Sequence, residues 1–138
     1  MQLCENMSRV SISQGKSVAA RIWNEGGYNW IVATVIDVLD DGKQYKVSDI
    51  FSPEAESTVS GENIIAFPQK YDSFKHGEIV LALWYDSSGN EWTTMFYPAI
   101  VLGNYDSTSK ILKLRYAGDP SIWFVQRNRI IKVPKIPK

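Results

Sequence analysis

The chain has 138 residues, the size of one domain or of two very small ones. Fifteen Lys and Arg balance fifteen Asp and Glu, so the formal net charge is zero, which argues against a function dominated by contacts with nucleic-acid phosphates. Aromatic residues make up 12% of the chain, with five Trp and seven Tyr. A core this small does not need all of them, so we expect some to line a surface.

Several classes of protein find no support in the sequence. No apolar run approaches the roughly 18 residues of a membrane-spanning helix, and the first ten residues do not resemble a secretory signal. One cysteine (Cys4) and one histidine (His76) cannot supply the ligands of a structural zinc site. His76 lies in a polar stretch and is better interpreted as a solvated linker residue than as a catalytic one. We expect no membrane span, no metal, no cofactor and no enzymatic activity.

The first half of the chain predicts five short strands. The segment 16–23 ends at a glycine-rich turn, and the run 29–39 alternates apolar side chains over both of its faces. Asp-Asp-Gly at 40–42 predicts a hairpin turn into a returning strand at 43–50. A weak strand at 56–60 and a last one at 64–67 complete this unit.

The second half repeats the pattern after about 65 residues, which is the length of a small domain rather than of most solenoid repeats. Strands are expected at 78–84, 95–102, 111–116, 122–125 and 129–133, with a polar loop at 85–93. Each barrel alone would bury little surface. The sequence therefore predicts an all-β fold of two tandem five-stranded SH3-like or Tudor barrels packed together, with the first barrel at 15–67 and the second at 77–134.

The ordered segments of both repeats resemble a known family. The first unit carries KSVAAR at 16–21, WIVATV at 30–35 and YKVSD at 45–49, and the second carries VLALW at 80–84, FYPAIV at 96–101 and LKLRY at 112–116. Together they are similar to the tandem Tudor domain of the SAGA-associated factor 29 family, over about residues 15–134. No single one of these motifs is decisive, but their order across two repeats is specific.

This resemblance implies a chromatin reader. Members of that family bind the N-terminal tail of histone H3 methylated on its lysine 4, as subunits of a histone acetyltransferase coactivator complex in the nucleus. Their second Tudor unit supplies an aromatic cage for the methylammonium group, and their first supplies an acidic pocket for the free N-terminal amine. This chain lacks the N-terminal helical region usual in the family, so we expect it to be a fragment or a short member.

The positions that match the cage are Trp84, Tyr97 and Tyr116. Aromatic faces suit a methylammonium because it is weakly hydrated and is attracted by the ring quadrupole. The alternative is that these rings belong to the barrel core, a serious competitor for Tyr116, which shares its strand face with two leucines. Phe96 points away from Tyr97 in strand alternation and is interpreted as core.

The position that matches the amine pocket is Asp49. The family's second acidic position is Phe51 here, which weakens the expectation of amine recognition unless Glu54 substitutes. The alternative for Asp49 is a solvated turn residue. Asp119, close to an acid of the family but displaced, is interpreted as a turn former before Pro120.

The other tryptophans divide into two pairs. Trp30 and Trp123 lie in predicted strands and are expected to pack within or between the barrels. Trp23 and Trp92 lie at loop edges, where each could touch a peptide. Trp92 belongs to an insertion at 86–92 that could form a lid over the cage.

Two other functions stay open. A Tudor module could recognise methylarginine or another methylated ligand, because aromatic walls attract both cations. A scaffold or nucleic-acid role is the second alternative. It would rest on a modest basic tail of Arg127, Arg129, Lys132, Lys135 and Lys138, which we interpret as at most accessory at zero net charge.

Overall fold

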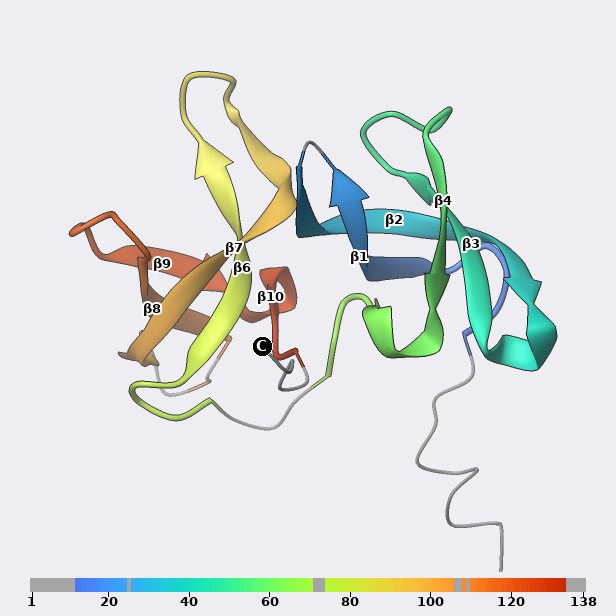
Figure 1. Cartoon of the computed structure of the whole chain (residues 1–138). Coiled ribbons are helices and arrows are strands. Elements are labelled where there is room, and N and C mark those ends of the chain that lie inside the picture. Colours follow the sequence, from blue (N-terminus) through green and yellow to red (C-terminus); the bar gives the residue numbers. More distant parts are fainter. Residues whose placement is uncertain (1–11, 25, 71–73, 106–107, 109, 134–138) are drawn as a thin grey trace, which may run out of the picture.

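The computed structural model describes residues 12–24, 26–70, 74–105, 108 and 110–133. These residues form ten β-strands and three short 3-10 turns (Figure 1). The predicted all-β class is confirmed, and the strands pair as two five-stranded barrels. Residues 134–138, with Lys135 and Lys138 of the expected basic tail, lie outside the described part of the chain.

The first barrel is a meander closed by its last strand. Its strands are β1 (Ser17–Asn24), β2 (Gly27–Leu39), β3 (Gln44–Asp49), β4 (Glu56–Ser60) and β5 (Ile64–Ala66). The first four pair in chain order, and β5 returns to pair with β1. The expected turn at 40–42 is the 3-10 turn η1 (Asp40–Gly42), where Asp41 and Gly42 adopt the positive φ that Asp and Gly tolerate best. The predicted hairpin is thereby confirmed.

The second barrel repeats this topology. Its strands are β6 (Ile79–Asp86), β7 (Glu91–Asn104), β8 (Ile111–Tyr116), β9 (Trp123–Gln126) and β10 (Ile130–Ile131). β10 follows the 3-10 turn η3 (Arg127–Arg129) and pairs back with β6. Each barrel has its own core of buried apolar side chains, at alternate positions of its strands.

The polar loop expected at 85–93 is wrong. β6 continues to Asp86 and β7 begins at Glu91, so only a short turn separates them, and the hairpin projects from the barrel (Figure 1). The physical reason is a cross-strand aromatic pair, because Tyr85 lies opposite Trp92 with ring centroids 5.5 Å apart. Polar composition alone does not reveal this pairing.

A third apolar core joins the barrels. Its buried members are Ala19, Trp30, Leu83, Phe96 and Ile131. Phe67 packs edge-to-face on Phe96, with ring centroids 5.3 Å apart. The barrels also share one ladder contact, Ile31 with Met95, which connects β2 to β7. The expectation that the two units pack together is confirmed, and Trp30 and Phe96 are core residues as predicted, although their core lies between the barrels.

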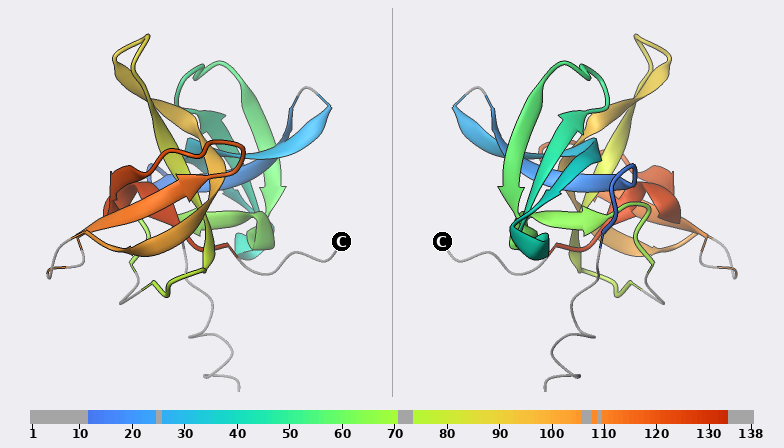
Figure 2. Two further views of the ribbon diagram at one scale, coloured as in Figure 1. Left: turned by 90° about the vertical axis from the view of Figure 1, so that its left-hand side faces the viewer. Right: turned by 90° about the vertical axis from the view of Figure 1, so that its right-hand side faces the viewer.

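The third core and the Ile31–Met95 contact together form the joint between the barrels. The hairpins beside this joint point in different directions. Figure 2 shows β1–β2 projecting to one side while β6–β7 projects upward. Because β2 and β7 meet at the joint, the position of one barrel fixes where the loops of the other lie. The joint is therefore what places the candidate sites of the two barrels relative to each other.

We predict that Phe96→Ala lowers the free energy of unfolding by about 3–5 kcal/mol, because it leaves a cavity in the core between the barrels. Phe96 is 5% exposed, whereas Phe51 is 73% exposed, so Phe51→Ala is a matched control expected to change stability by less than about 0.5 kcal/mol. Urea unfolding followed by tryptophan fluorescence measures both. Equal midpoints for the two variants would contradict this account of the joint.

Candidate aromatic cage

Four aromatic side chains gather at one end of the second barrel. Tyr97 packs on Trp84 (ring centroids 6.4 Å apart), Trp84 packs on Trp123 (6.1 Å), and Trp123 packs on Tyr116 (6.1 Å). All three contacts are edge-to-face, with interplanar angles of 73–83°. The structure therefore brings Trp84 and Tyr97 into direct contact, and Tyr116 joins them through Trp123.

A β-bulge on β7 lies opposite Trp84. Leu83 lies opposite Phe96 but Tyr85 lies opposite Trp92, so the register shifts at Trp84. The Trp84 amide donates instead to the Thr93 hydroxyl at 3.0 Å, and that hydroxyl donates to the Met95 carbonyl at 2.8 Å. The half-buried indole lies on the same face of β6 as Val80 and Ala82, so strand alternation places it against the core of the second barrel rather than in the joint.

Tyr97 is the most accessible of the four rings. It shares its face of β7 with Ala99 and Val101, which are buried in the second barrel, but it is itself 37% exposed. Its ring thus lies where the barrel interior opens to solvent. Phe96, on the opposite face of β7, packs in the joint.

Tyr116 lies deepest. It is 6% exposed, belongs to the barrel core, and its hydroxyl donates to the Leu83 carbonyl. Burial raises the pKa of this phenol, so it stays neutral and keeps that hydrogen bond. Of the two roles considered from the sequence, the structure places Tyr116 in the barrel core, where its ring packs against Trp123, and its role as a cage wall stays a prediction.

Trp123 is the site residue that sequence reasoning missed. Its indole N–H donates to a carboxylate oxygen of Asp119 at 3.0 Å, while the other oxygen accepts from the Ser121 amide at 2.8 Å. Asp119 is therefore a turn former, as expected, and it also fixes the tryptophan. The Ser121 amide and the Trp123 indole hold the pKa of Asp119 below its ordinary value. The spacing Asp119-x-x-x-Trp123 around a proline turn was the available signal.

Asp49 lies in the first barrel at the end of β3, opposite Ala33. One carboxylate oxygen accepts from the Phe51 amide at 2.8 Å and from the Ser52 amide at 3.4 Å. This is the local geometry of an Asx turn. Asp49 thus stabilises the loop that follows β3, and its interaction with a terminal amine stays a prediction. The neighbouring Phe51 side chain is largely exposed.

Trp92 packs into the protein and does not form a lid. It is partly buried against both the second-barrel core and the core of the joint. The Arg129 guanidinium lies over its ring, 4.2 Å from the centroid. These contacts anchor the base of the β6–β7 hairpin.

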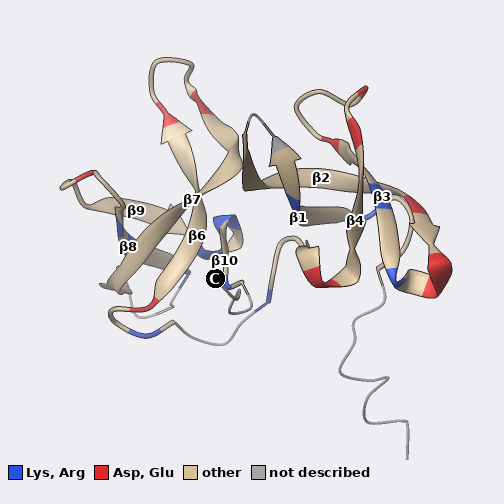
Figure 3. Ribbon diagram, viewed as in Figure 1, with Lys and Arg blue, Asp and Glu red and all other residues tan. Residues whose placement is uncertain are grey.

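Acidic residues surround this end of the molecule. Figure 3 shows them in the loops that join β3 to β4, β6 to β7 and β8 to β9, all on the upper side of the view. The residues in these loops and at the strand ends beside them are Asp49, Glu54, Glu56, Asp86, Glu91 and Asp119. The side chain and backbone of Ser88 donate to Asp86 and lower the pKa of that carboxyl. A cationic ligand would therefore be attracted here, although the net charge of the chain is zero.

The described residues contain no cluster of three or more His, Cys, Asp or Glu that could hold a metal ion. Within the same part of the chain, no helix has the length and apolarity to span a membrane. The site consists of aromatic faces and nearby carboxylates, a combination suited to binding a cation.

We predict that the environment of the Trp123 indole follows the protonation of Asp119. Because the folded pKa is lowered, the hydrogen bond is fully present above the ordinary Asp pKa of about 3.9 and is lost as pH falls through the lower folded value. The indole N–H resonance in a nitrogen–proton correlation spectrum should titrate in that range. Asp119→Asn should abolish this titration, and an unchanged titration curve in the variant would contradict the assignment.

Among solved structures, the chain is similar to the AGD34 segment of AGDP1 from Arabidopsis thaliana, with 13% identity, a TM-score of 0.49, and coverage of 92% of this chain and 84% of that one. It is also similar to the tandem Agenet domains 3–4 of ADCP1, with 11% identity, a TM-score of 0.48, and coverage of 92% and 82%. A search of curated proteins found no significant match.

The model of one protein family covers nearly the whole of both barrels. The SGF29 tudor-like domain matches residues 14–134, which include every strand described above. The family resemblance inferred from the segments of the two repeats is therefore confirmed. The chain belongs to the SGF29 tudor-like domain family.

Proposed function

We propose that this protein is a chromatin reader module that binds the N-terminal tail of histone H3 methylated at lysine 4. The second barrel would hold the methylammonium, and the first would hold the terminal amine. The observation that carries the proposal is the cluster of four rings, open at Tyr97 and bordered by acidic loops, in a chain of the SGF29 tudor-like family. The setting would be a SAGA-type histone acetyltransferase complex in the nucleus.

The chemistry of the cluster supports a methylated cation. A trimethylammonium donates no hydrogen bond, so it gains most from aromatic faces that shield its methyl groups and present their negative quadrupole. Each such contact contributes about 0.5–2 kcal/mol, and three contacts are consistent with micromolar affinity. Trp84, Tyr97 and Trp123 supply the accessible or half-buried rings, and Tyr116 supplies the base.

The spacing of the two predicted pockets suits an extended peptide. Asp49 pairs with Ala33 on β2, and two residues away Ile31 pairs with Met95, which is two residues from Tyr97. β1 occupies the other edge of β2 at both Ala33 and Ile31, so β3 and β7 lie along the same edge of β2. On a flat sheet the separation corresponds to about 13 Å, from four residues of strand length. Three residues of extended chain span about 10 Å, and a lysine side chain supplies the remaining reach.

The acidic loops favour a ligand that is basic along its length. A histone tail carries several Lys and Arg, and the carboxylates of the three upper loops would raise its local concentration and its association rate. This attraction depends on salt, since three of the six side chains are exposed and the other three are only partly buried. It does not require any catalytic group, and the proposal assigns none.

We predict that Tyr97→Ala weakens binding of an H3 peptide trimethylated at lysine 4 by at least about tenfold, because it removes the exposed wall of the cage. Tyr105→Ala is the control, because Tyr105 is 57% exposed and packs on Phe124 away from the cage. Calorimetric titration with unmodified and trimethylated peptides measures both variants. Equal affinity for the two peptides would contradict the lysine proposal, and methylarginine peptides would then be titrated.

Recognition of the amine is tested at Asp49. Asp49→Asn keeps an oxygen for the Phe51 and Ser52 amides but removes the charge that would pair with an ammonium. We expect a several-fold loss of affinity for the free-amine peptide and no change for the same peptide acetylated at its N-terminus. Asp37→Asn, an exposed aspartate on β2, is the charge-matched control. Equal losses with both peptides would refute the amine pocket.

A further inference from the structure

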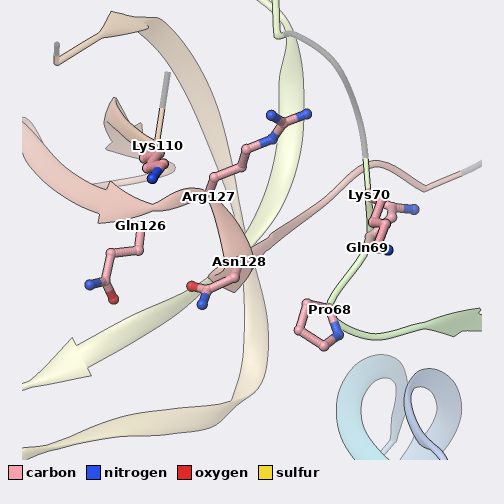
Figure 4. Close-up of a pocket in the computed structure, with 7 residues that line it drawn as sticks. All are labelled: Pro68, Gln69, Lys70, Lys110, Gln126, Arg127 and Asn128. Atoms are coloured by element: carbon pink, nitrogen blue, oxygen red, sulfur yellow. The ribbon is translucent and has the colours of Figure 1, made fainter. Parts of the chain in front are cut away.

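A pocket lies away from the aromatic cluster, between the segment that leaves the first barrel and the turn that closes the second. Its volume is about 500 Å³. Figure 4 shows Pro68, Gln69 and Lys70 on one side of it and Lys110, Gln126, Arg127 and Asn128 on the other. Both walls are tied to the fold, because the Gln69 side chain exchanges hydrogen bonds with the backbone of Lys132, and the Arg127 amide donates to the Lys110 carbonyl.

The lining of this pocket is entirely neutral or cationic. Lys70, Lys110 and Arg127 supply three positive charges, the two glutamines and Asn128 supply amide groups, and no lining residue is acidic. Nearby Lys132 is already neutralised by Glu78, with the charged atoms 3.2 Å apart. The three lining cations form no ion pair of that kind within the described part of the chain.

Arg127 is the unusual member. Its Nη2 atom is buried and has no hydrogen-bond partner among the described residues. The carbon at the centre of its guanidinium lies 5.7 Å from the centroid of the Phe74 ring, a contact that offers no acceptor oxygen. A buried guanidinium N–H without an acceptor is unfavourable, because it has lost its water and gained nothing in exchange.

We propose that this pocket binds the phosphate group of a phosphorylated ligand. Arginine presents a planar set of donors that matches a phosphate, and the two lysines add positive charge on opposite sides of the pocket. The volume is in the range of small-molecule sites and leaves room for an organic portion, which Pro68 and the aliphatic stems of the lysines would contact. The site is independent of the aromatic cluster, and both can be occupied at once.

The test is a titration of the whole chain with inorganic pyrophosphate and with adenosine monophosphate, followed by nitrogen–proton correlation spectra. Amide shifts should be confined to residues 69–70, 110 and 126–128. Arg127→Gln should weaken binding by about tenfold or more, and Lys110→Gln by a few-fold. Arg115→Gln, an exposed charge on the outer side of β8, is the matched control and should bind like the parent chain. Tyr97→Ala should also leave phosphate binding unchanged.

Three results would overturn the proposal. These are no localised shifts at millimolar probe, equal weakening by all the charge-removing variants, or full binding by both Lys110→Gln and Arg127→Gln. Lys110 is exposed, so its variant gives a result even if Arg127→Gln disturbs folding. A short DNA duplex added as competitor identifies the source of the phosphate. Displacement of the small probes indicates a nucleic-acid backbone, and no displacement indicates a free phosphorylated compound.

Discussion

The apolar joint between the two barrels is the constraint on which the rest of the structure depends. Each barrel has a small core of its own, and a third core around Trp30 and Phe96 is buried only because the barrels meet. The same contact aligns β2 with β7 through Ile31 and Met95, so the end of β3 and the middle of β7 have a fixed relation. A two-part site that spans both barrels is possible only if this joint holds. Recognition of an extended ligand by both barrels would therefore depend on the burial of apolar side chains in the joint.

The aromatic cluster is an extension of the second core into solvent. Tyr116 is buried within that core, Trp123 and Trp84 are half-buried, and Tyr97 is exposed, so the rings form a gradient from interior to surface. Three local features hold these rings in position. They are the bulge opposite Trp84, the hydrogen bond from the Tyr116 hydroxyl to the Leu83 carbonyl, and the hydrogen bond from the Trp123 indole to Asp119. Because the walls are anchored before any ligand arrives, little conformational entropy would be lost on binding.

Zero net charge conceals a separation of charge in space. Carboxylates occupy three loops near the aromatic cluster, whereas Lys70, Lys110 and Arg127 line a pocket that has no acid in its walls (Figure 3). The two surfaces attract ligands of opposite sign, and their separation keeps either field from cancelling the other. A net charge of zero therefore does not exclude a cationic surface, since the basic tail considered from the sequence contains Arg127, which is partly buried and lines that pocket.

Strand periodicity, turn residues and the internal repeat determined the all-β class, the two barrels and the buried positions of Trp30 and Phe96, because these depend on local alternation and on the need of small barrels to share a core. The ordered motifs of the two repeats were enough to identify the family. The sequence could not show the β6–β7 hairpin in place of a polar loop, since that hairpin depends on Tyr85 facing Trp92 across strands. Nor could it place Trp123 in the aromatic cluster or show Asp49 hydrogen-bonded to its own turn, because both depend on side-chain directions. Register, bulges and the meeting of distant segments at one surface are decided by tertiary packing, which selects among side-chain arrangements that local propensity leaves equivalent.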